Sequence, residues 1–310
     1  MITLPKEKTK PSCSLSKLSM LIYGAPKIGK STFCSRIDKA LFIATEPGLN
    51  YLETYNVRVN TWLEFLEVMA ALKREEHPFE VIVIDTIDRL CDFCDTYICE
   101  QAKVQTISDV GGYGKGYALF KTEMNRVFQK IFAMNLGVVI TSHTVMAEVP
   151  TPSGKQIQYQ PSVQKRIQDI IIPLVDIIGF AHSISAINKD GECVEARVLE
   201  TAETTSWVAG DRTGRLPSTL PFNFHVFKKY FMKSEDKPKS EAAERAAAIS
   251  EEILSEDAEA QIVKPEPEPS EDKTIAEEVE PEEVKPEEVK PEESDKSQPK
   301  TTKRAAKKGE

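Results

Sequence analysis

Short apolar runs without polar alternation recur through the first half of the chain. Such runs are typical of parallel strands that are buried on both faces of a sheet. We therefore expect parallel strands in four segments: LSMLIYG (18–24), ALFIAT (40–45), VIVI (81–84) and LGVVITSH (136–143).

Helical periodicity fills the intervals between these runs. STFCSRIDKA (31–40) can open a helix directly after the first run, and TWLEFLEVMAALKREE (61–76) places apolar residues at helical spacing. Alternating strands and helices predict an α/β fold, a mostly parallel sheet flanked by helices. Further strands are expected on either side of the turn NKDG (188–191), and PFNFHVFKKYF (221–231) predicts a closing helix.

The composition of the chain changes at Ser234. Residues 234–310 hold 24 acidic and 13 basic residues, no aromatic residue and a repeat of the form Val-(Glu/Lys)-Pro-Glu-Glu. Regular prolines interrupt helices, and this charge density opposes burial, so we expect a disordered acidic tail. The tail can serve a protein partner or remain a solvated appendage. Residues 1–15 are expected to be a flexible N-terminus, and 16–233 the folded domain, which is close to neutral and can still carry a nucleic-acid-binding surface.

The sequence favours a cytoplasmic protein without membrane contact. No apolar run reaches the roughly 18 residues of a membrane span, and no signal peptide is visible. The six cysteines do not form the framework of a secreted disulfide protein. Cys91, Cys94 and Cys99 fall within one expected helix, where they either face the core or bind a metal.

The first apolar run leads into GAPKIGKST (24–32), which matches the pattern G-x-x-x-x-G-K-[ST]. In such a loop the backbone N–H groups face phosphates, the lysine reaches the β- and γ-phosphates, and the hydroxyl after it binds Mg²⁺. The alternative is a strand-to-helix turn without a ligand. The expected nucleotide-binding residues are Gly24, Ala25, Pro26, Lys27, Ile28, Gly29, Lys30, Ser31 and Thr32, with Lys30 also catalytic and Ser31 also a metal ligand.

Polar residues stand at the ends of the three later runs: Glu46, Asp85 and His143. The carboxyl ends of strands line the ligand crevice of an open α/β sheet. We expect Asp85 to direct Mg²⁺, Glu46 to be the general base for the attacking water, and His143 to sense the γ-phosphate. A loop carboxylate and an ordinary histidine at a strand end are the alternatives for Glu46 and His143. Asp88 is expected only to start the following helix.

The ordered motifs of the chain resemble those of the phage-encoded RecA-like ATPases that act as single-strand annealing recombination proteins. These motifs are GAPKIGKST, TEPG, VIVIDTID, GGYGKGY and VITSH. The resemblance covers about residues 15–230. It implies a RecA-like P-loop NTPase core, with Glu46 polarising the hydrolytic water and Asp85 as the Walker B carboxylate. His143 departs from the family pattern, since recombinases often carry Gln at the end of this strand.

Two segments then take the places of the DNA loops of recombinases, namely 108–121 and 144–168. Flexible glycines, tyrosine rings and cations suit sequence-tolerant binding of single-stranded DNA. The alternatives are a glycine-rich turn whose tyrosines pack on the sheet and, for Lys165 or Arg166, a contact with the ATP of a neighbouring subunit. A β-hairpin around PSGK is also expected in the second segment, and it is compatible with a DNA loop. The candidate DNA contacts are Tyr113, Lys115, Tyr117, Lys155, Lys165 and Arg166.

The first functional hypothesis is an ATP-binding and slowly hydrolysing protein that binds single-stranded DNA and promotes annealing in phage recombination. ATP and Mg²⁺ are the expected cofactors, and a homo-oligomeric ring or filament is the expected assembly. The alternatives are a helicase-like ring ATPase of replication and a P-loop nucleotide kinase. The kinase is disfavoured because the chain shows no arginine-rich lid segment.

Overall fold

A computed structural model describes residues 4, 6–8, 14–151, 154–187 and 193–232. The expectations for the acidic tail at 234–310 and for the turn at 188–191 lie outside these residues. No helix in the described part of the chain is both long enough and apolar enough to cross a membrane.

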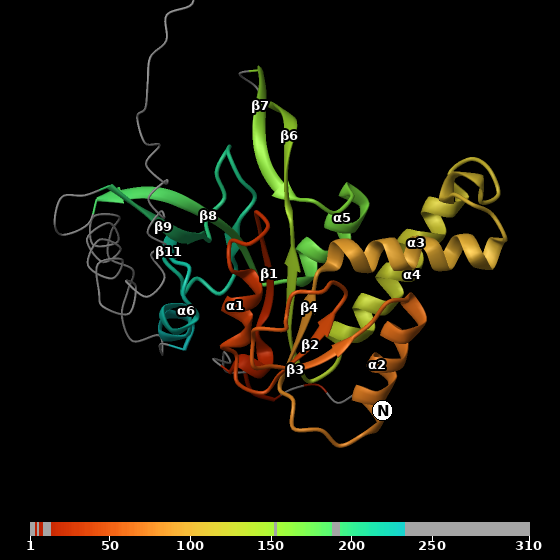
Figure 1. The fold of residues 1–310 in the computed structure, drawn as a ribbon, viewed down its shortest axis with the longest axis horizontal. Coiled ribbons are helices and arrows are strands. Elements are labelled where there is room, and N and C mark those ends of the chain that lie inside the picture. Colours follow the sequence, from red (N-terminus) through yellow and green to blue (C-terminus); the bar gives the residue numbers. More distant parts are fainter. Residues whose placement is uncertain (1–3, 5, 9–13, 152–153, 188–192, 233–310) are drawn as a thin grey trace, which may run out of the picture. The chain divides into compact units, whose positions relative to one another are not determined.

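One nine-stranded sheet forms the centre of the described structure (Figure 1). Six neighbouring strands are mutually parallel, in the order β3-β2-β4-β5-β1-β8. Strand β9 pairs antiparallel with β8, β11 pairs antiparallel with β9, and β10 pairs antiparallel with β8. The strands are β1 Ser19–Gly24, β2 Ala40–Ala44, β3 Tyr55–Arg58, β4 Val81–Asp85, β5 Gly137–Ser142, β8 Ile177–Ile187, β9 Cys193–Glu200, β10 Gly210–Asp211 and β11 Thr219–Pro221.

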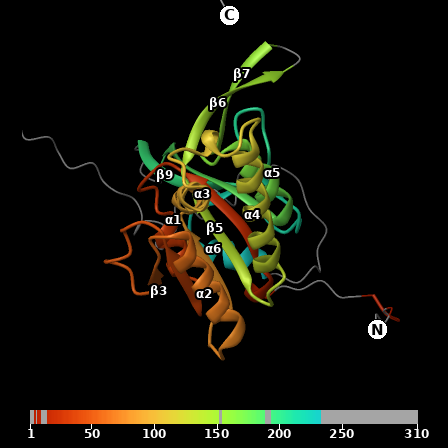
Figure 2. The same cartoon turned by 90° about the vertical axis from the view of Figure 1, so that its right-hand side faces the viewer.

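Helices cover both faces of the sheet (Figures 1 and 2). On one face the side chains of β1 residues Leu21 and Tyr23 join a core with four helices, and on the other face Met20 and Ile22 join a core with two helices. The first face carries α2 Trp62–Arg74, α3 Ile87–Ala102, α4 Lys115–Phe132 and α5 Lys165–Leu174, and the second carries α1 Lys30–Ser35 and α6 Phe224–Phe231. The predicted fold class is confirmed: a mostly parallel sheet flanked by helices. Two short 3₁₀ helices, η1 Leu15–Lys17 and η2 Ile107–Asp109, complete these elements.

The four predicted strands correspond to β1, β2, β4 and β5, and the buried residues in them explain the apolar runs. The sequence did not predict β3, because Tyr55, Asn56 and Arg58 are exposed on this edge strand and only Val57 is half-buried. An edge strand with one partner and little burial leaves almost no hydrophobic pattern. Its pairing with β2 is therefore set by the tertiary structure.

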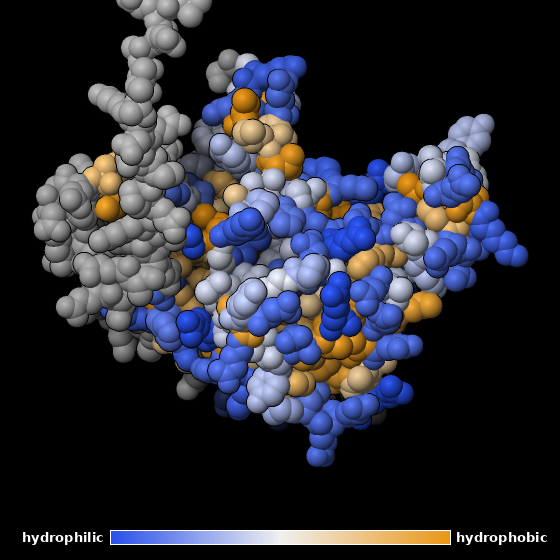
Figure 3. Space-filling view, in the orientation of Figure 1, coloured by the Kyte–Doolittle hydropathy of each residue, from blue (hydrophilic) through white to orange (hydrophobic). Residues whose placement is uncertain are grey.

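A separate two-stranded hairpin follows β5 and extends beyond the sheet (Figure 1). Strands β6 (Thr144–Thr151) and β7 (Gly154–Pro161) pair antiparallel, which confirms the hairpin expected around PSGK. Its more exposed face carries Met146 and Ile157, which are 63% and 59% exposed, and Figure 3 shows hydrophobic surface on the hairpin.

Gly24 ends β1 where the chain passes close to β8. A β-carbon added at Gly24 would run into the carbonyl oxygen of Ala181, a backbone atom that the sheet holds in place. We expect Gly24→Ala to lower the free energy of unfolding by about 1–3 kcal/mol, the usual range for overpacking. Urea unfolding followed by circular dichroism measures the change.

The matched control for this prediction is Gly210→Ala in β10, where an added β-carbon meets no atom within 4 Å. We expect its unfolding midpoint to stay close to that of the unaltered protein. Equal midpoints for both variants would show that β8 gives way, contrary to the prediction.

Candidate nucleotide-binding site

The phosphate-loop motif, residues 24–32, runs from the end of β1 into the first turn of α1 at the carboxyl edge of the sheet. Gly29 is the N-cap of α1 and adopts φ +108°, a left-handed conformation that favours glycine. No side chain caps the start of α1, so its first backbone N–H groups are not taken by a local side-chain acceptor. The loop thus has the backbone geometry that the motif predicts for an anion cradle.

Lys30 is a buried cation within this loop, with 6% of its surface exposed. Its Nζ donates to the carbonyl oxygens of Gly24 and Ala25, at 2.9 and 3.0 Å. Burial lowers the pKa of Lys30, and the negative charges of Asp85, Asp88 and Glu46 oppose that shift. The ammonium group therefore lies among acceptors and carboxylates, in a position where a phosphate can replace the loop carbonyls as its partner.

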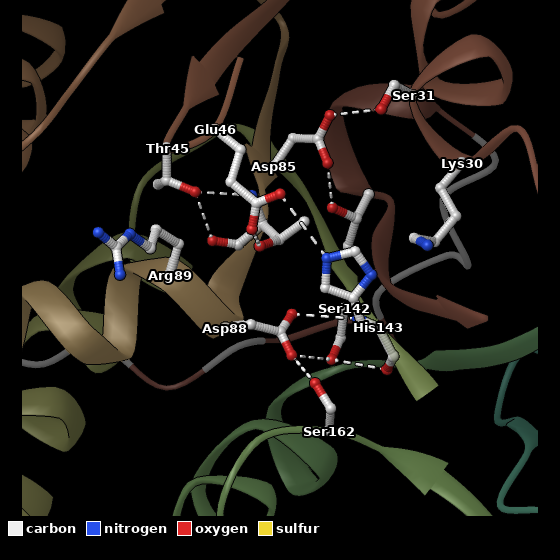
Figure 4. A network of polar contacts seen from close by, with 12 residues as sticks. Lys30, Ser31, Thr45, Glu46, Asp85, Asp88, Arg89, Ser142, His143 and Ser162 are labelled. Atoms are coloured by element: carbon white, nitrogen blue, oxygen red, sulfur yellow. Dashed lines mark hydrogen bonds and ion pairs between the residues drawn. The ribbon is translucent and has the colours of Figure 1, made fainter. Parts of the chain in front are cut away.

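Ser31 and Asp85 lie together beside the loop (Figure 4). The Ser31 hydroxyl donates to Asp85 Oδ2 at 2.6 Å, and the Thr141 hydroxyl of β5 donates to Asp85 Oδ1 at 2.5 Å. Asp85 is itself buried, and both of its oxygens are held by neighbours. A hydroxyl and a carboxylate oxygen are hard ligands that suit Mg²⁺, which commonly takes one or two carboxylates together with substrate phosphates.

Glu46 and His143 face one another across the same edge (Figure 4). The Thr86 hydroxyl donates to Glu46 Oε1 at 2.9 Å, while Glu46 Oε2 lies 3.7 Å from His143 Nε2. Both side chains are about a third exposed, and His143 Nδ1 is buried without a hydrogen-bond partner in the described structure. The sequence predicted separate roles for the two residues, and the structure makes them neighbours.

Asp88 is the residue whose environment the sequence did not predict. It lies in the first turn of α3, as expected, but its carboxylate accepts hydrogen bonds from the Ser142 hydroxyl and the His143 N–H, each at 3.1 Å, and from the Ser162 hydroxyl. Burial raises the pKa of Asp88, and the His143 N–H and the charge of His143 oppose this. Asp88 therefore joins the end of β5 to the segment that follows the β6–β7 hairpin.

A family model described as an AAA domain, AAA_24, matches residues 16–213 of the chain. This match spans the whole nucleotide-binding edge and more than half of the sequence. The chain belongs to this AAA domain family. It is accordingly an AAA-type P-loop ATPase by family.

The chain is also similar to individual proteins, at 25% sequence identity or less. The chain is 25% identical over 206 residues to the SPbeta prophage-derived uncharacterized protein YorG of Bacillus subtilis (strain 168), covering 64% of this chain and 61% of that protein. Among solved structures, the flagellar accessory protein FlaH of Methanocaldococcus jannaschii matches at 12% identity and a TM-score of 0.38, covering 66% of this chain and 84% of FlaH. A KaiC-like protein of Pyrococcus horikoshii OT3 matches at 11% identity and a TM-score of 0.32, covering 59% and 78%.

The structure brings the two predicted DNA segments of the AAA domain into contact. The guanidinium carbon of Arg166, in α5, lies 4.1 Å from the centre of the Tyr117 ring, in α4. Tyr117 also packs against the core, as the alternative interpretation of this segment expected, so its ring is not free on both faces. Tyr113 is fully exposed in the turn before α4, and the side chain of Lys115 lies against Gly111.

The two remaining predicted DNA contacts, Lys155 and Lys165, each form an ion pair with a carboxylate. Lys155, on the hairpin, donates to Glu148 at 2.9 Å, and Lys165 Nζ lies 3.8 Å from an oxygen of Asp169. All four of these side chains are about half exposed or more, so the ion pairs are weak and can exchange for other partners.

The three cysteines of α3 belong to the core of the AAA domain. Cys91, Cys94 and Cys99 are buried among the hydrophobic residues that α3 packs against. Burial raises the pKa of Cys91 and Cys94 above the ordinary range of a thiol. Among the described residues, no group of three or more His, Cys, Asp or Glu side chains is placed to hold a metal ion.

Proposed function

We propose that this AAA domain binds Mg·ATP and hydrolyses it slowly at the carboxyl edge of the sheet. The observation that carries the proposal is the joint placement of a buried Lys30, a hydrogen-bonded Ser31–Asp85 pair and a partly exposed Glu46 around one loop. Loop N–H groups and Lys30 would hold the β- and γ-phosphates. Ser31 and Asp85 would hold Mg²⁺, which neutralises phosphate charge when it is bound.

Glu46 is proposed to take a proton from the attacking water. Its Oε1 is fixed by the Thr86 hydroxyl, which leaves Oε2 to face the site. His143 Nε2 lies 3.7 Å from that second oxygen, so the histidine can keep the carboxylate oriented and sense the γ-phosphate from beside Glu46, since its Nδ1 is buried. Thr45, directly after β2, holds the backbone of Thr86, because its hydroxyl accepts from the Thr86 N–H at 2.8 Å and donates to the Thr86 carbonyl at 2.9 Å.

We further propose that the protein binds single-stranded DNA and promotes annealing in phage recombination, as a homo-oligomeric ring or filament in the cytoplasm. The resemblance of its ordered motifs and the prophage origin of the relative support this proposal. The contact between Arg166 and Tyr117 supports it as well, because it joins the two segments, and Tyr113 of the first segment is fully exposed. Asp88 links the 144–168 segment to the end of β5, because it accepts from the Ser162 hydroxyl and from the His143 N–H.

The test is fluorescence anisotropy with a labelled oligo-dT, with and without Mg·ATP. We expect the unaltered protein to bind more tightly with Mg·ATP, and Lys30→Ala to lose this gain. Tyr113→Ala should weaken binding about fivefold or more, because stacking a base on an aromatic ring contributes roughly 1–3 kcal/mol. Tyr51→Ala is the matched control, since Tyr51 is equally exposed but lies in the loop after β2.

The other outcomes decide between functions. Equal losses for Tyr113→Ala and Tyr51→Ala would remove the 108–121 segment from the DNA surface. Absence of DNA binding under every nucleotide condition would contradict the DNA proposal and favour the kinase, for which phosphate transfer to a small acceptor is the assay. ATP-driven unwinding of a duplex would favour the helicase-like motor.

A further inference from the structure

The groups expected to act on the γ-phosphate all come from one side of β1. Asp85, Glu46 and His143 stand at or just beyond the ends of β4, β2 and β5. These three strands lie on the same side of β1 in the sheet, in the order β5, β4, β2. On the other side of β1 lie β8 and β9. A nucleotide whose terminal phosphates point toward Asp85 therefore has its ribose and base directed toward β8 and β9.

Arg197 of β9 borders the phosphate loop on that second side. Its Nη1 lies 3.6 Å from the position that a β-carbon on Gly29 would occupy, and Cε1 of Phe222 lies 3.9 Å from the same point. The guanidinium group has no hydrogen-bond or ion-pair partner among the residues that the structure describes. An unpaired, half-buried arginine thus lies next to the glycine that precedes Lys30.

The backbone of Arg197 is held by its surroundings. The Phe222 N–H donates to the Arg197 carbonyl oxygen at 2.9 Å, and Arg197 pairs with Ser183 of β8. Phe222 is buried and stacks on Phe33 of α1, with ring centres 4.9 Å apart and planes 8° apart. Since α1 is the helix that starts at Lys30, these contacts tie β9 to the phosphate loop.

We propose that Arg197 binds the nucleoside part of ATP, with the guanidinium stacked on the base or donating to the ribose. A guanidinium is planar, stacks on aromatic faces and offers several N–H donors in a fixed arrangement. The proposed partners of the phosphates are Lys30 and the loop N–H groups, which leaves the guanidinium for the nucleoside. This inference rests on the proposed function, because it names the group that recognises the nucleoside at the same site.

The experiment compares ATP with inorganic tripolyphosphate, which has the same phosphates and no nucleoside. Isothermal titration calorimetry with magnesium is performed on the full chain and on Arg197→Ala, Arg197→Lys and Arg36→Ala. We expect Arg197→Ala to weaken ATP binding about tenfold and to leave tripolyphosphate binding within about twofold. Arg197→Lys keeps the charge but loses the planar group, so it should recover little ATP affinity.

Arg36→Ala is the matched control, because Arg36 is an exposed arginine at the C-terminal end of α1. Equal weakening of both ligands by Arg197→Ala would place the guanidinium on a phosphate and overturn the proposal, as would unchanged ATP affinity. Lys30→Ala should weaken the binding of both ATP and tripolyphosphate, which separates loss of phosphate binding from loss of nucleoside binding. If the unaltered protein binds neither ligand, the proposed function fails and this inference fails with it.

Discussion

Replacing Lys30 by alanine should reduce ATP hydrolysis by at least about a hundredfold and weaken Mg·ATP binding. The reason is that Lys30 is the buried cation of the phosphate loop, and its present partners are the carbonyl oxygens of the loop itself. A charge that stabilises the transferring phosphoryl group is typically among the largest single contributions to phosphoryl transfer. Phosphate release and calorimetric binding measure the two effects.

Loss of the fold should not explain this result. Burial lowers the pKa of Lys30, so the charged form is less favourable in the folded protein than in the solvated, unfolded chain. Removing the charge should therefore leave thermal unfolding close to that of the unaltered protein. Lys73→Ala, an exposed lysine in the last turn of α2, is the matched control. Hydrolysis retained in Lys30→Ala would contradict the placement of the phosphates in this loop.

Replacing Glu46 by glutamine should leave Mg·ATP binding nearly unchanged and lower the hydrolysis rate by about 10²–10⁴-fold, the usual contribution of a general base. Glutamine keeps an oxygen that can accept from the Thr86 hydroxyl, so the side chain can stay in place. It cannot take a proton from water. Single-turnover hydrolysis, measured together with nucleotide binding, separates the two effects.

Glu75→Gln is the control for this substitution, because Glu75 is an exposed carboxylate at the end of α2. A Glu46→Gln protein that hydrolyses ATP at the normal rate would show that another carboxylate activates the water. Asp88 would then be the first residue to examine, since burial raises its pKa and it contacts the end of β5.

Together the two variants separate nucleotide binding from nucleotide turnover. If ATP binding alone supports the DNA-binding state, Glu46→Gln should bind oligo-dT as tightly as the unaltered protein in Mg·ATP, whereas Lys30→Ala should not. If ATP turnover is needed, both variants should lose the tighter oligo-dT binding that Mg·ATP gives the unaltered protein. The path through Asp88 gives a physical reason to expect coupling, because one carboxylate holds both His143 and Ser162.

The sequence by itself determined the phosphate loop, the four central strands and the polar residues at their ends. Each of these features is local: a strand buried on both faces has to be apolar throughout, and a phosphate loop needs glycines and a lysine at fixed spacing. Parallel strands end at one edge, so Glu46, Asp85 and His143 could be assigned to one crevice before any contact was known.

Only the tertiary structure decided how these residues are held and which others join them. Thr141 supports Asp85, Asp88 binds the end of β5, and Arg166 stacks on Tyr117 through contacts between segments that are distant in sequence. Arg197 lies beside Gly29 because β9 pairs with β8, which pairs with β1. Strand register and helix packing set these distances, and the spacing of residues along the chain does not say which side chains meet across two elements.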